Sequence, residues 1–298
     1  MTGSCVIISS LSSKLCLTIR FSSSANFLVL LQLCKITQST KRITIFVLAK
    51  FKKGVFEGKN TSFMITKKEL KQINSLATKK ARKTEQQFLV EGKKSVEEFI
   101  AGGFQPKKLF STENTKLKGA VLVTENEMQK MSCLKNASPH LGVFEIPQAN
   151  VLPNKGRILI LDKVSDPGNL GTILRICDWF GIKNIIGSLD TVDCYNPKVV
   201  QASMASLARV QCQYTDLNEY LSKTPLSIFG TYLVGKSIYE TAFPEDAILV
   251  MGSEANGIST ELEALIGQKV TIPKKSTNGP ESLNVAIATA LVLGEITR

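Results

Sequence analysis

Short runs of almost purely apolar residues alternate with helical segments through the second half of the chain. The run RILILD (157–162) has the composition of a strand that is buried on both faces of a sheet. A polar loop, a helical segment and a second apolar run, NIIG (184–187), follow in the order typical of a parallel βαβ unit. Three later runs, LSIFGTYLV, AILVMGSE and QKVTIP, predict further strands, and the final helix is expected to begin at about Ser282. This alternation predicts an α/β domain with a parallel sheet over residues 151–298.

A smaller α/β domain is predicted for residues 64–150. Thr66 and Glu69 have the spacing of a capping box, at the start of the helical pattern TKKELKQINSLATKKARK. The segment KKSVEEFIAGGF predicts a helix that ends at Gly102 and Gly103. The runs QFLVEG, PKKLFST, AVLVTE and GVFEIP predict strands, with a helix in ENEMQKMSCL before the last of them.

Residues 1–63 lack the pattern of a folded domain and are expected to be unstructured. They contain nine basic residues and one acidic residue, and so carry +8 of the net charge of +12. The segment is Ser-rich and acid-poor, as in a mitochondrial transit peptide, but it has no clear signal-peptide pattern, and its apolar run NFLVLLQLC is too short to span a bilayer. A start of translation at Met64, with the upstream residues mis-annotated, is the favoured interpretation.

Charge and composition favour an anionic partner and a cytoplasmic location. A pI near 9.3 and a second basic run between Lys67 and Lys94 point to nucleic acid. The seven cysteines are odd in number and form no CxxC pair, which favours reduced thiols over a disulfide framework or a zinc site. With His140 as the one histidine, sites that need several His ligands are excluded, and a structural role is expected for it. We therefore expect neither a metal site nor a membrane span.

Three polar, glycine-containing loops each follow a predicted strand. In open parallel sheets, ligands bind beyond the carboxyl ends of the strands. In the first loop, DPGNLGTILR, Gly168 and Gly171 are interpreted as allowing a tight turn. The second and third loops lie in LVMGSEANGIS and TIPKKSTNGPESLNVAIATA. The polar candidates in the three loops are Asn169, Arg175, Glu254, Ser282 and Asn284.

Each candidate also has an ordinary structural interpretation. Arg175 could be an exposed helix residue, about one turn after Gly171. Glu254 could cap the next helix or orient Arg175, and Ser282 and Asn284 could cap the final helix. The common nucleotide-binding loops are excluded, because the sequence has no GxxxxGK[ST] and no GxGxxG after a strand.

Taken together and in this order, the three loops resemble the motifs of the SpoU (TrmH-like) family of RNA 2′-O-ribose methyltransferases. In SDPGNLGTILRICDWFGI an Asn precedes an Arg by six residues, LVMGSEANGIS has the pattern G-x-E-x-x-G, and IPKKSTNGPESLNVAIATALVLGEI contains Ser-Leu-Asn-Val. The segment RKTEQQFLVEGKKSVEEFI resembles the family's N-terminal substrate-binding domain, which is ribosomal-protein-like and recruits RNA. Nothing in residues 1–63 resembles the family.

The resemblance implies a trefoil-knotted α/β fold of the SPOUT superfamily, an exception to the rule that chains avoid knots. It also implies a homodimer with the active site near the knot, S-adenosylmethionine (SAM) as methyl donor, and structured RNA as substrate, with 23S rRNA favoured over tRNA. By position, Arg175 would activate the ribose 2′-hydroxyl with Asn169 at its side, Glu254 would help to build the site, and Ser282 and Asn284 would position the arginine, the ribose or its phosphate. The residues implied in cofactor binding, largely through backbone groups, are Thr231, Gly252, Ile272 and Leu283.

The chemistry limits what the arginine can do. An arginine normally stays protonated, so Arg175 as a base requires a lowered pKa; otherwise its role is positioning and electrostatic. Because the sulfonium donor is already activated, alignment of the hydroxyl with the methyl group can supply much of the rate.

Two features depart from the family pattern, and two other functions stay open. The loop between Ile272 and Ser282 is longer than in many members and carries Lys274 and Lys275, and Ala286 stands where many members have Ser. The chain could instead be a non-catalytic RNA-binding or ribosome-assembly factor with the same fold, or methylate a protein or a small molecule. Binding of SAM separates the assembly factor from the enzymes.

Overall fold

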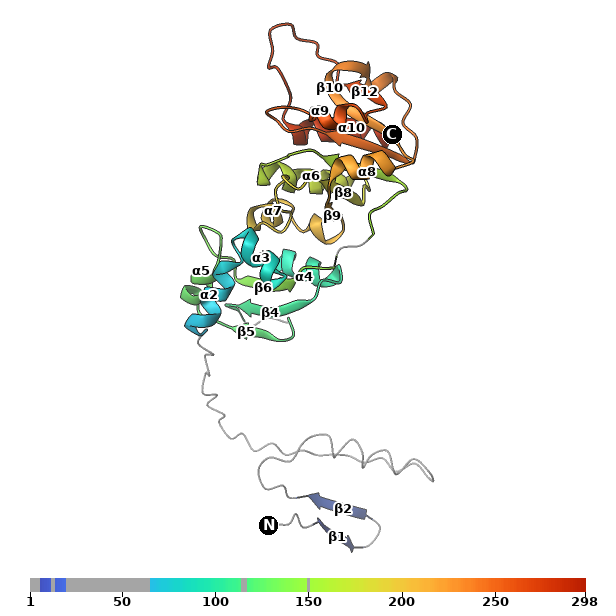
Figure 1. Cartoon of the computed structure of the whole chain (residues 1–298). Coiled ribbons are helices and arrows are strands. Elements are labelled where there is room, and N and C mark those ends of the chain that lie inside the picture. Colours follow the sequence, from blue (N-terminus) through green and yellow to red (C-terminus); the bar gives the residue numbers. More distant parts are fainter. Residues whose placement is uncertain (1–5, 12–13, 20–64, 114–116, 149–150) are drawn as a thin grey trace. The chain divides into compact units, whose positions relative to one another are not determined.

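The computed structural model describes residues 6–11, 14–19, 65–113, 117–148 and 151–298. The chain divides into two units, Met1–Lys59 and Asn60–Arg298, and Figure 1 shows the described strands and helices of each. In the first unit, β1 (Val6–Leu11) and β2 (Lys14–Ile19) form an antiparallel pair of strands that the sequence analysis did not predict. The remaining expectations for residues 1–63, and the proposed start at Met64, lie outside the described residues.

The second unit contains a four-stranded sheet, within what we call the four-stranded part (residues 65–148). Its strand order is β3 (Gln87–Glu91), β6 (His140–Glu145), β4 (Pro106–Ser111) and β5 (Ala120–Leu122). β6 is antiparallel to both of its neighbours, whereas β4 and β5 are parallel. The helices of this part are α2 (Lys67–Ser75), α3 (Lys79–Glu85), α4 (Lys93–Ala101) and α5 (Glu125–Met131).

Side-chain caps explain where the first helices begin. The predicted capping box is confirmed, because the Thr66 hydroxyl accepts a hydrogen bond from the Glu69 amide and the Glu69 carboxylate accepts one from the Thr66 amide. The helical pattern that follows is two helices and not one. Thr78 adopts an extended backbone and accepts a hydrogen bond from the Ala81 amide, so it caps a new helix, α3.

A six-stranded sheet forms the centre of what we call the six-stranded part (residues 151–298). The strand order is β12 (Gln268–Thr271), β10 (Ser227–Ser237), β11 (Ala247–Met251), β7 (Arg157–Leu161), β8 (Asn184–Gly187) and β9 (Gln211–Tyr214). Every pair of neighbours is parallel, which confirms the predicted sheet. β11 and β7 are central, and β11 is buried along its whole length, as its apolar composition requires.

The helices of this part connect the parallel strands. They are α6 (Pro167–Trp179), α7 (Pro197–Ala202), α8 (Leu217–Lys223), α9 (Thr260–Glu263) and α10 (Val285–Ile296), with 3₁₀ turns η1 (Ser206–Ala208) and η2 (Ile238–Glu240). The sequence analysis did not assign α8 or α9. α10 begins three residues later than the predicted Ser282, because the Asn284 side chain caps the helix and leaves Ser282 before it.

None of the helices in the described parts of the chain is long and apolar enough to cross a membrane.

Candidate active site

Three loops converge at the carboxyl edge of the six-stranded sheet. Asn169 lies in the first turn of α6, Glu254 in the loop after β11, and Asn284 directly before α10. The Asn169 side-chain amide donates a hydrogen bond to Glu254 Oε1 (2.5 Å), and the Asn284 amide donates one to Asn169 Oδ1 (2.9 Å). These three side chains, 85 and 115 residues apart in sequence, thus form one polar cluster.

The first residues of α6 fix the position of Asn169. Asp166 is the N-cap residue, Pro167 opens the helix, and Asp166 Oδ1 accepts a hydrogen bond from the Asn169 amide (2.7 Å). The expectation of a tight turn at Gly168 and Gly171 is wrong, because both lie inside the helix. Gly171 is instead a packing residue: a Cβ added to it would lie 2.4 Å from the Cβ of Ala202, the last residue of α7.

The loop after β11 is closed by its own backbone. Ser253 and Gly257 exchange two hydrogen bonds of 3.0 Å, and a Cβ on Gly252 would lie 2.1 Å from the Gly257 carbonyl carbon. Asp162, at the end of β7 and only 2 % exposed, accepts a hydrogen bond from the Ser259 amide (2.7 Å). Asp162 therefore ties β7 to the loop that carries Glu254. Sequence analysis did not single out Asp162, although an acid ending an apolar strand was a visible signal.

Asn284 has two roles at once. Its Oδ1 accepts hydrogen bonds from the amides of Ala286 (2.9 Å) and Ile287 (3.2 Å), which caps α10. Its Nδ2 is left to reach Asn169. The side chain is thus both a helix cap and a member of the polar cluster.

Arg175 and Ser282 do not join this cluster. Both side chains are exposed, and neither side chain forms a hydrogen bond or an ion pair with any residue of the described chain. Residues six apart in a helix are separated by about 9 Å along the axis and point about 120° apart around it. Arg175 and Asn169 therefore lie on different faces of α6. Glu254 does not orient Arg175 by hydrogen bonding, and it does not cap α9, whose N-cap residue is Ser259.

The residues implied in cofactor binding lie within or directly after neighbouring strands, or shortly before α10. Thr231 is in register with Val270 of β12, and its hydroxyl donates to the Val250 carbonyl of β11 (3.1 Å). Gly252 and Ile272 directly follow β11 and β12, and Leu283, 46 % exposed, precedes α10. Backbone groups can hydrogen-bond to the nitrogens of the adenine ring of SAM, and partly exposed apolar side chains can pack against the uncharged faces of that ring. The residues present therefore fit SAM.

The one histidine of the chain lies apart from this cluster. His140 is buried at the start of β6 in the four-stranded part. Within the described ranges, no group of three or more His, Cys, Asp or Glu side chains could hold a metal ion. The four cysteines described, Cys133, Cys177, Cys194 and Cys212, are free thiols.

Two family models match the chain. The model of the SpoU rRNA methylase family matches residues 156–294, and that of the MRM3-like substrate binding domain matches residues 67–146. The structure of a putative RNA methyltransferase of the TrmH family from Porphyromonas gingivalis is 38 % identical, with a TM-score of 0.72 over 78 % of this chain and 98 % of that one. The AdoMet-bound rRNA methyltransferase from Sinorhizobium meliloti is 27 % identical, with a TM-score of 0.68 over 76 % and 93 % of the two chains.

Among curated relatives, the 23S rRNA (guanosine(2553)-2′-O)-methyltransferase of Bacillus subtilis is 25 % identical over 236 residues, which cover 76 % of this chain and 94 % of the relative. The parallel α/β fold and the three converging loops are thus those of an RNA methyltransferase. The chain belongs to the SpoU rRNA methylase family.

Proposed function

We propose that this protein transfers a methyl group from SAM to a ribose 2′-hydroxyl of rRNA. The observation that carries the proposal is the hydrogen-bonded cluster of Asn169, Glu254 and Asn284, which joins one residue from each of the three sequence motifs. SAM supplies an electrophilic methyl group when it is bound. The protein's own residues would hold the hydroxyl in line with it.

We assign the site residues as follows. Asn169, Glu254 and Asn284 form the floor of the site, where each amide or carboxylate is fixed by its neighbour and so is already ordered before the substrate arrives. Arg175 and Ser282 are exposed and without a hydrogen bond inside the described chain, so their side chains are available to the ribose and its phosphate. Arg175 would activate or position the 2′-hydroxyl.

Thr231, Gly252, Ile272 and Leu283 would hold the cofactor. The placement of three of them supports this assignment: Gly252 and Ile272 directly follow β11 and β12, and Thr231 lies in β10, between those two strands in the sheet. Neighbouring parallel strands bring their following loops together. We further propose that the loops after β11 and β12 form the trefoil knot that the family resemblance implies.

A homodimer is part of this proposal. α10 packs beside α6, and both helices expose large apolar side chains: Trp179 is 86 % exposed, Ile287 52 % and Leu291 42 %. Ile287 and Leu291 are four residues apart and share a helix face, as Trp179 does with Arg175. Exposed apolar patches of this kind mark interaction surfaces, and a second copy of the chain would cover this one.

We assign residues 64–150 to substrate binding and residues 151–298 to catalysis. The match of residues 67–146 to a substrate-binding domain supports the first assignment. The basic run from Lys67 to Lys94 supports RNA as the ligand, since phosphate contacts dominate such binding. The 23S rRNA named for the Bacillus relative is the substrate we favour, and the cytoplasm is the compartment.

A direct assay tests this function. The purified protein is incubated with labelled SAM and an unmodified transcript of 23S rRNA, and methylated riboses are mapped by mass spectrometry; tRNA serves as the comparison. Label on a ribose 2′-oxygen supports the proposal. SAM binding by calorimetry without transfer to either RNA would overturn it, and absence of SAM binding would favour the non-catalytic assembly factor.

A further inference from the structure

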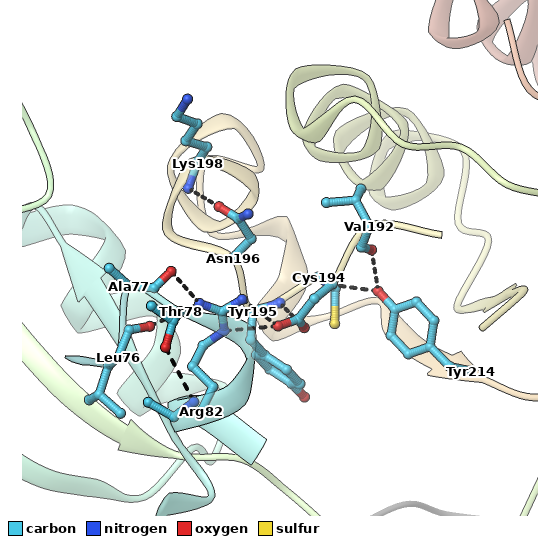
Figure 2. A network of polar contacts seen from close by, with 12 residues as sticks. Leu76, Ala77, Thr78, Arg82, Val192, Cys194, Tyr195, Asn196, Lys198 and Tyr214 are labelled. Atoms are coloured by element: carbon cyan, nitrogen blue, oxygen red, sulfur yellow. Dashed lines mark hydrogen bonds and ion pairs between the residues drawn. The ribbon is translucent and has the colours of Figure 1, made fainter. Parts of the chain in front are cut away.

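A buried arginine joins the two parts of the second unit. Arg82 of α3 is only 2 % exposed, and its guanidinium donates through Nε and Nη2 to Asp193 Oδ2 (2.8 and 2.6 Å). Nη1 donates to the carbonyls of Leu76 and Ala77, both at 2.9 Å (Figure 2). All three nitrogens of the guanidinium are therefore used, one side on the four-stranded part and the other on the loop between β8 and α7.

That loop is held from both parts. Asp193 Oδ1 accepts a hydrogen bond from the Tyr195 amide (3.0 Å), and the Tyr195 ring lies 4.6 Å from the ring of Phe88 in β3. From the other side, the Tyr214 hydroxyl accepts from the Cys194 amide (2.6 Å) and donates to the Val192 carbonyl (2.7 Å), as Figure 2 shows. The loop thus has one defined position relative to β3 and α3.

The same loop reaches the segment that carries the candidate site. The Val192 amide donates to the Val164 carbonyl (2.9 Å), and the Lys163 amide donates to the Ser188 hydroxyl (2.9 Å). Lys163 has a φ of +57°, a left-handed conformation that is costly for a lysine and has to be held by its surroundings. Three residues later, Asp166 caps α6 and fixes Asn169.

We propose that Arg82 is a positioning residue for methyl transfer: it sets the register between the substrate-binding residues 67–146 and the β7–α6 loop, which leads directly into the first turn of α6 and Asn169. This inference rests on the proposed function. A nucleotide bound by the four-stranded part can meet Asn169 only if the distance between the two is fixed, and Arg82 with Asp193 is the buried polar link that fixes it.

Energetics favour a geometric role over a purely stabilising one. A buried ion pair recovers little more than the cost of removing two charges from water, whereas its directional hydrogen bonds admit few arrangements. Arg82 makes four such bonds to three acceptor residues. A sliding motion of one part against the other would break the two bonds to Asp193 together, while the two bonds to Leu76 and Ala77 hold the guanidinium in place on the four-stranded part.

The test combines variants at three residues, one on each side of the Arg82–Asp193 ion pair and one at the later contact to Lys163. Arg82→Gln and Asp193→Asn remove the charge from either side, alone and together, and Ser188→Ala cuts the later contact to Lys163 without touching the ion pair. Arg82→Lys keeps the charge but cannot reproduce the planar fork of donors. Lys223→Gln, which breaks an exposed pair with Glu219 on α8, is the matched control.

Hydrogen exchange and kinetics are measured on each folded variant. We expect faster exchange in residues 161–169 and 188–196 for Arg82→Gln, Asp193→Asn and Ser188→Ala, and no change for Lys223→Gln. We expect kcat/KM for 23S rRNA to fall by about 10- to 100-fold, because misplacement of about 1 Å has that effect, while the Kd for SAM is unchanged. The double variant should lose no more kcat/KM than either single variant, and Arg82→Lys should show the same loss as Arg82→Gln.

Two outcomes would overturn the proposal that Arg82 sets this register. One is unchanged exchange in residues 161–169 when Arg82→Gln or Asp193→Asn is folded; the other is additive losses in the double variant. If the wild-type protein binds SAM but methylates no rRNA, only the proposed function fails. The exchange data then still decide whether Arg82 positions the β7–α6 loop and the first turn of α6.

Discussion

The contact between the two parts and the candidate active site use the same kinds of side chain in opposite ways. At the contact, Arg82 is 2 % exposed and has a carboxylate and two carbonyls as partners. At the candidate site, the exposed Glu254 accepts a hydrogen bond from Asn169, and the exposed side chain of Arg175 on the same helix as Asn169 forms no hydrogen bond in the described chain. The folded chain completes the hydrogen bonds of the first region by itself, whereas in the second it leaves the Arg175 guanidinium without a partner among the described residues.

The difference separates residues that a fold needs from residues that a reaction needs. Removing a group from the contact leaves a buried partner without its hydrogen bonds, so the protein loses stability. Removing an exposed donor from the site leaves the fold intact and changes only what is bound. The predictions below test this separation, from the largest expected effect to the smallest.

Arg82→Ala is expected to lower the free energy of unfolding by about 3–5 kcal/mol, because it leaves Asp193 without its cation in a largely buried position. Denaturant unfolding measures the change. The double variant Arg82→Met with Asp193→Leu should regain most of the stability, since apolar pairs often replace buried ion pairs without loss. A loss below 1 kcal/mol in Arg82→Ala would mean that the contact is as weak as an exposed one.

Arg175→Ala is expected to lower kcat by about 100- to 1,000-fold, the usual effect of removing one donor to the reacting group. Its unfolding free energy and SAM affinity should stay at wild-type values, because the side chain has no partner in the described chain. Single-turnover transfer to rRNA measures the loss of activity, and calorimetry measures the unfolding and the SAM affinity. Lys183→Ala, an exposed residue after α6, is the control; wild-type transfer by Arg175→Ala would exclude its assigned role.

Two variants of Asn284 separate its role as the cap of α10 from its hydrogen bond to Asn169. Asn284→Ala removes both functions, and should cost about 0.5–2 kcal/mol of stability. Asn284→Asp keeps an oxygen for the cap but loses the donor to Asn169, so stability should be retained while transfer falls by about 2- to 10-fold. Equal stability losses in both variants would show that the amide group itself is needed for the cap.

Arg209→Gln is expected to have the smallest effect and a distinct pH dependence. Arg209 is half exposed and donates to Glu98 of α4 and Asp178 of α6. Its hydrogen bonds lower the pKa of Glu98. At Asp178 burial is the largest single influence and raises the pKa, but the hydrogen bonds from Arg209 and Ser206 and the charge of Arg209 together outweigh it, so that pKa is lowered too.

The sign follows from these shifts. A carboxyl group with a lowered pKa in the folded state stabilises the fold above its ordinary pKa, here 4.5 for Glu98 and 3.8 for Asp178, and loses that contribution as the pH falls further. Wild type should therefore exceed Arg209→Gln by about 0.2–1 kcal/mol at pH 7, and the difference should shrink below pH 4.5. Urea unfolding at several pH values tests this; a difference that grows in acid would contradict it.

Much of the fold could be predicted from local patterns. The apolar run at Arg157–Leu161 predicted a buried parallel strand, and the Thr66 and Glu69 spacing predicted a capped helix, because both depend on residues close in sequence. The short helices α8 and α9 were missed, since seven and four residues give too little periodicity. The division of α2 from α3 was missed because Thr78 also fits a helix interior until its cap is seen.

Three of the five polar site candidates meet in the structure, but the hydrogen bonds that connect them were not predicted. The motifs selected Asn169, Glu254 and Asn284, and the structure brings these three together. The pairing of Glu254 with Asn169, and not with Arg175, depends on the rotation of α6, which the spacing alone left open. The burial of Arg82 was not predicted, because it lies in a basic run, where lysines and arginines usually face solvent.

The sequence by itself determined the parallel α/β class, the three motifs and the membership of an RNA methylase family, because strand composition, helix caps and motif order are properties of neighbouring residues. The tertiary structure alone decided which polar groups meet. It selected Arg82 as a buried partner of Asp193, 111 residues away, and left Arg175 exposed. The reason is physical: burial and hydrogen bonding depend on chain segments that come together only when both sheets have formed.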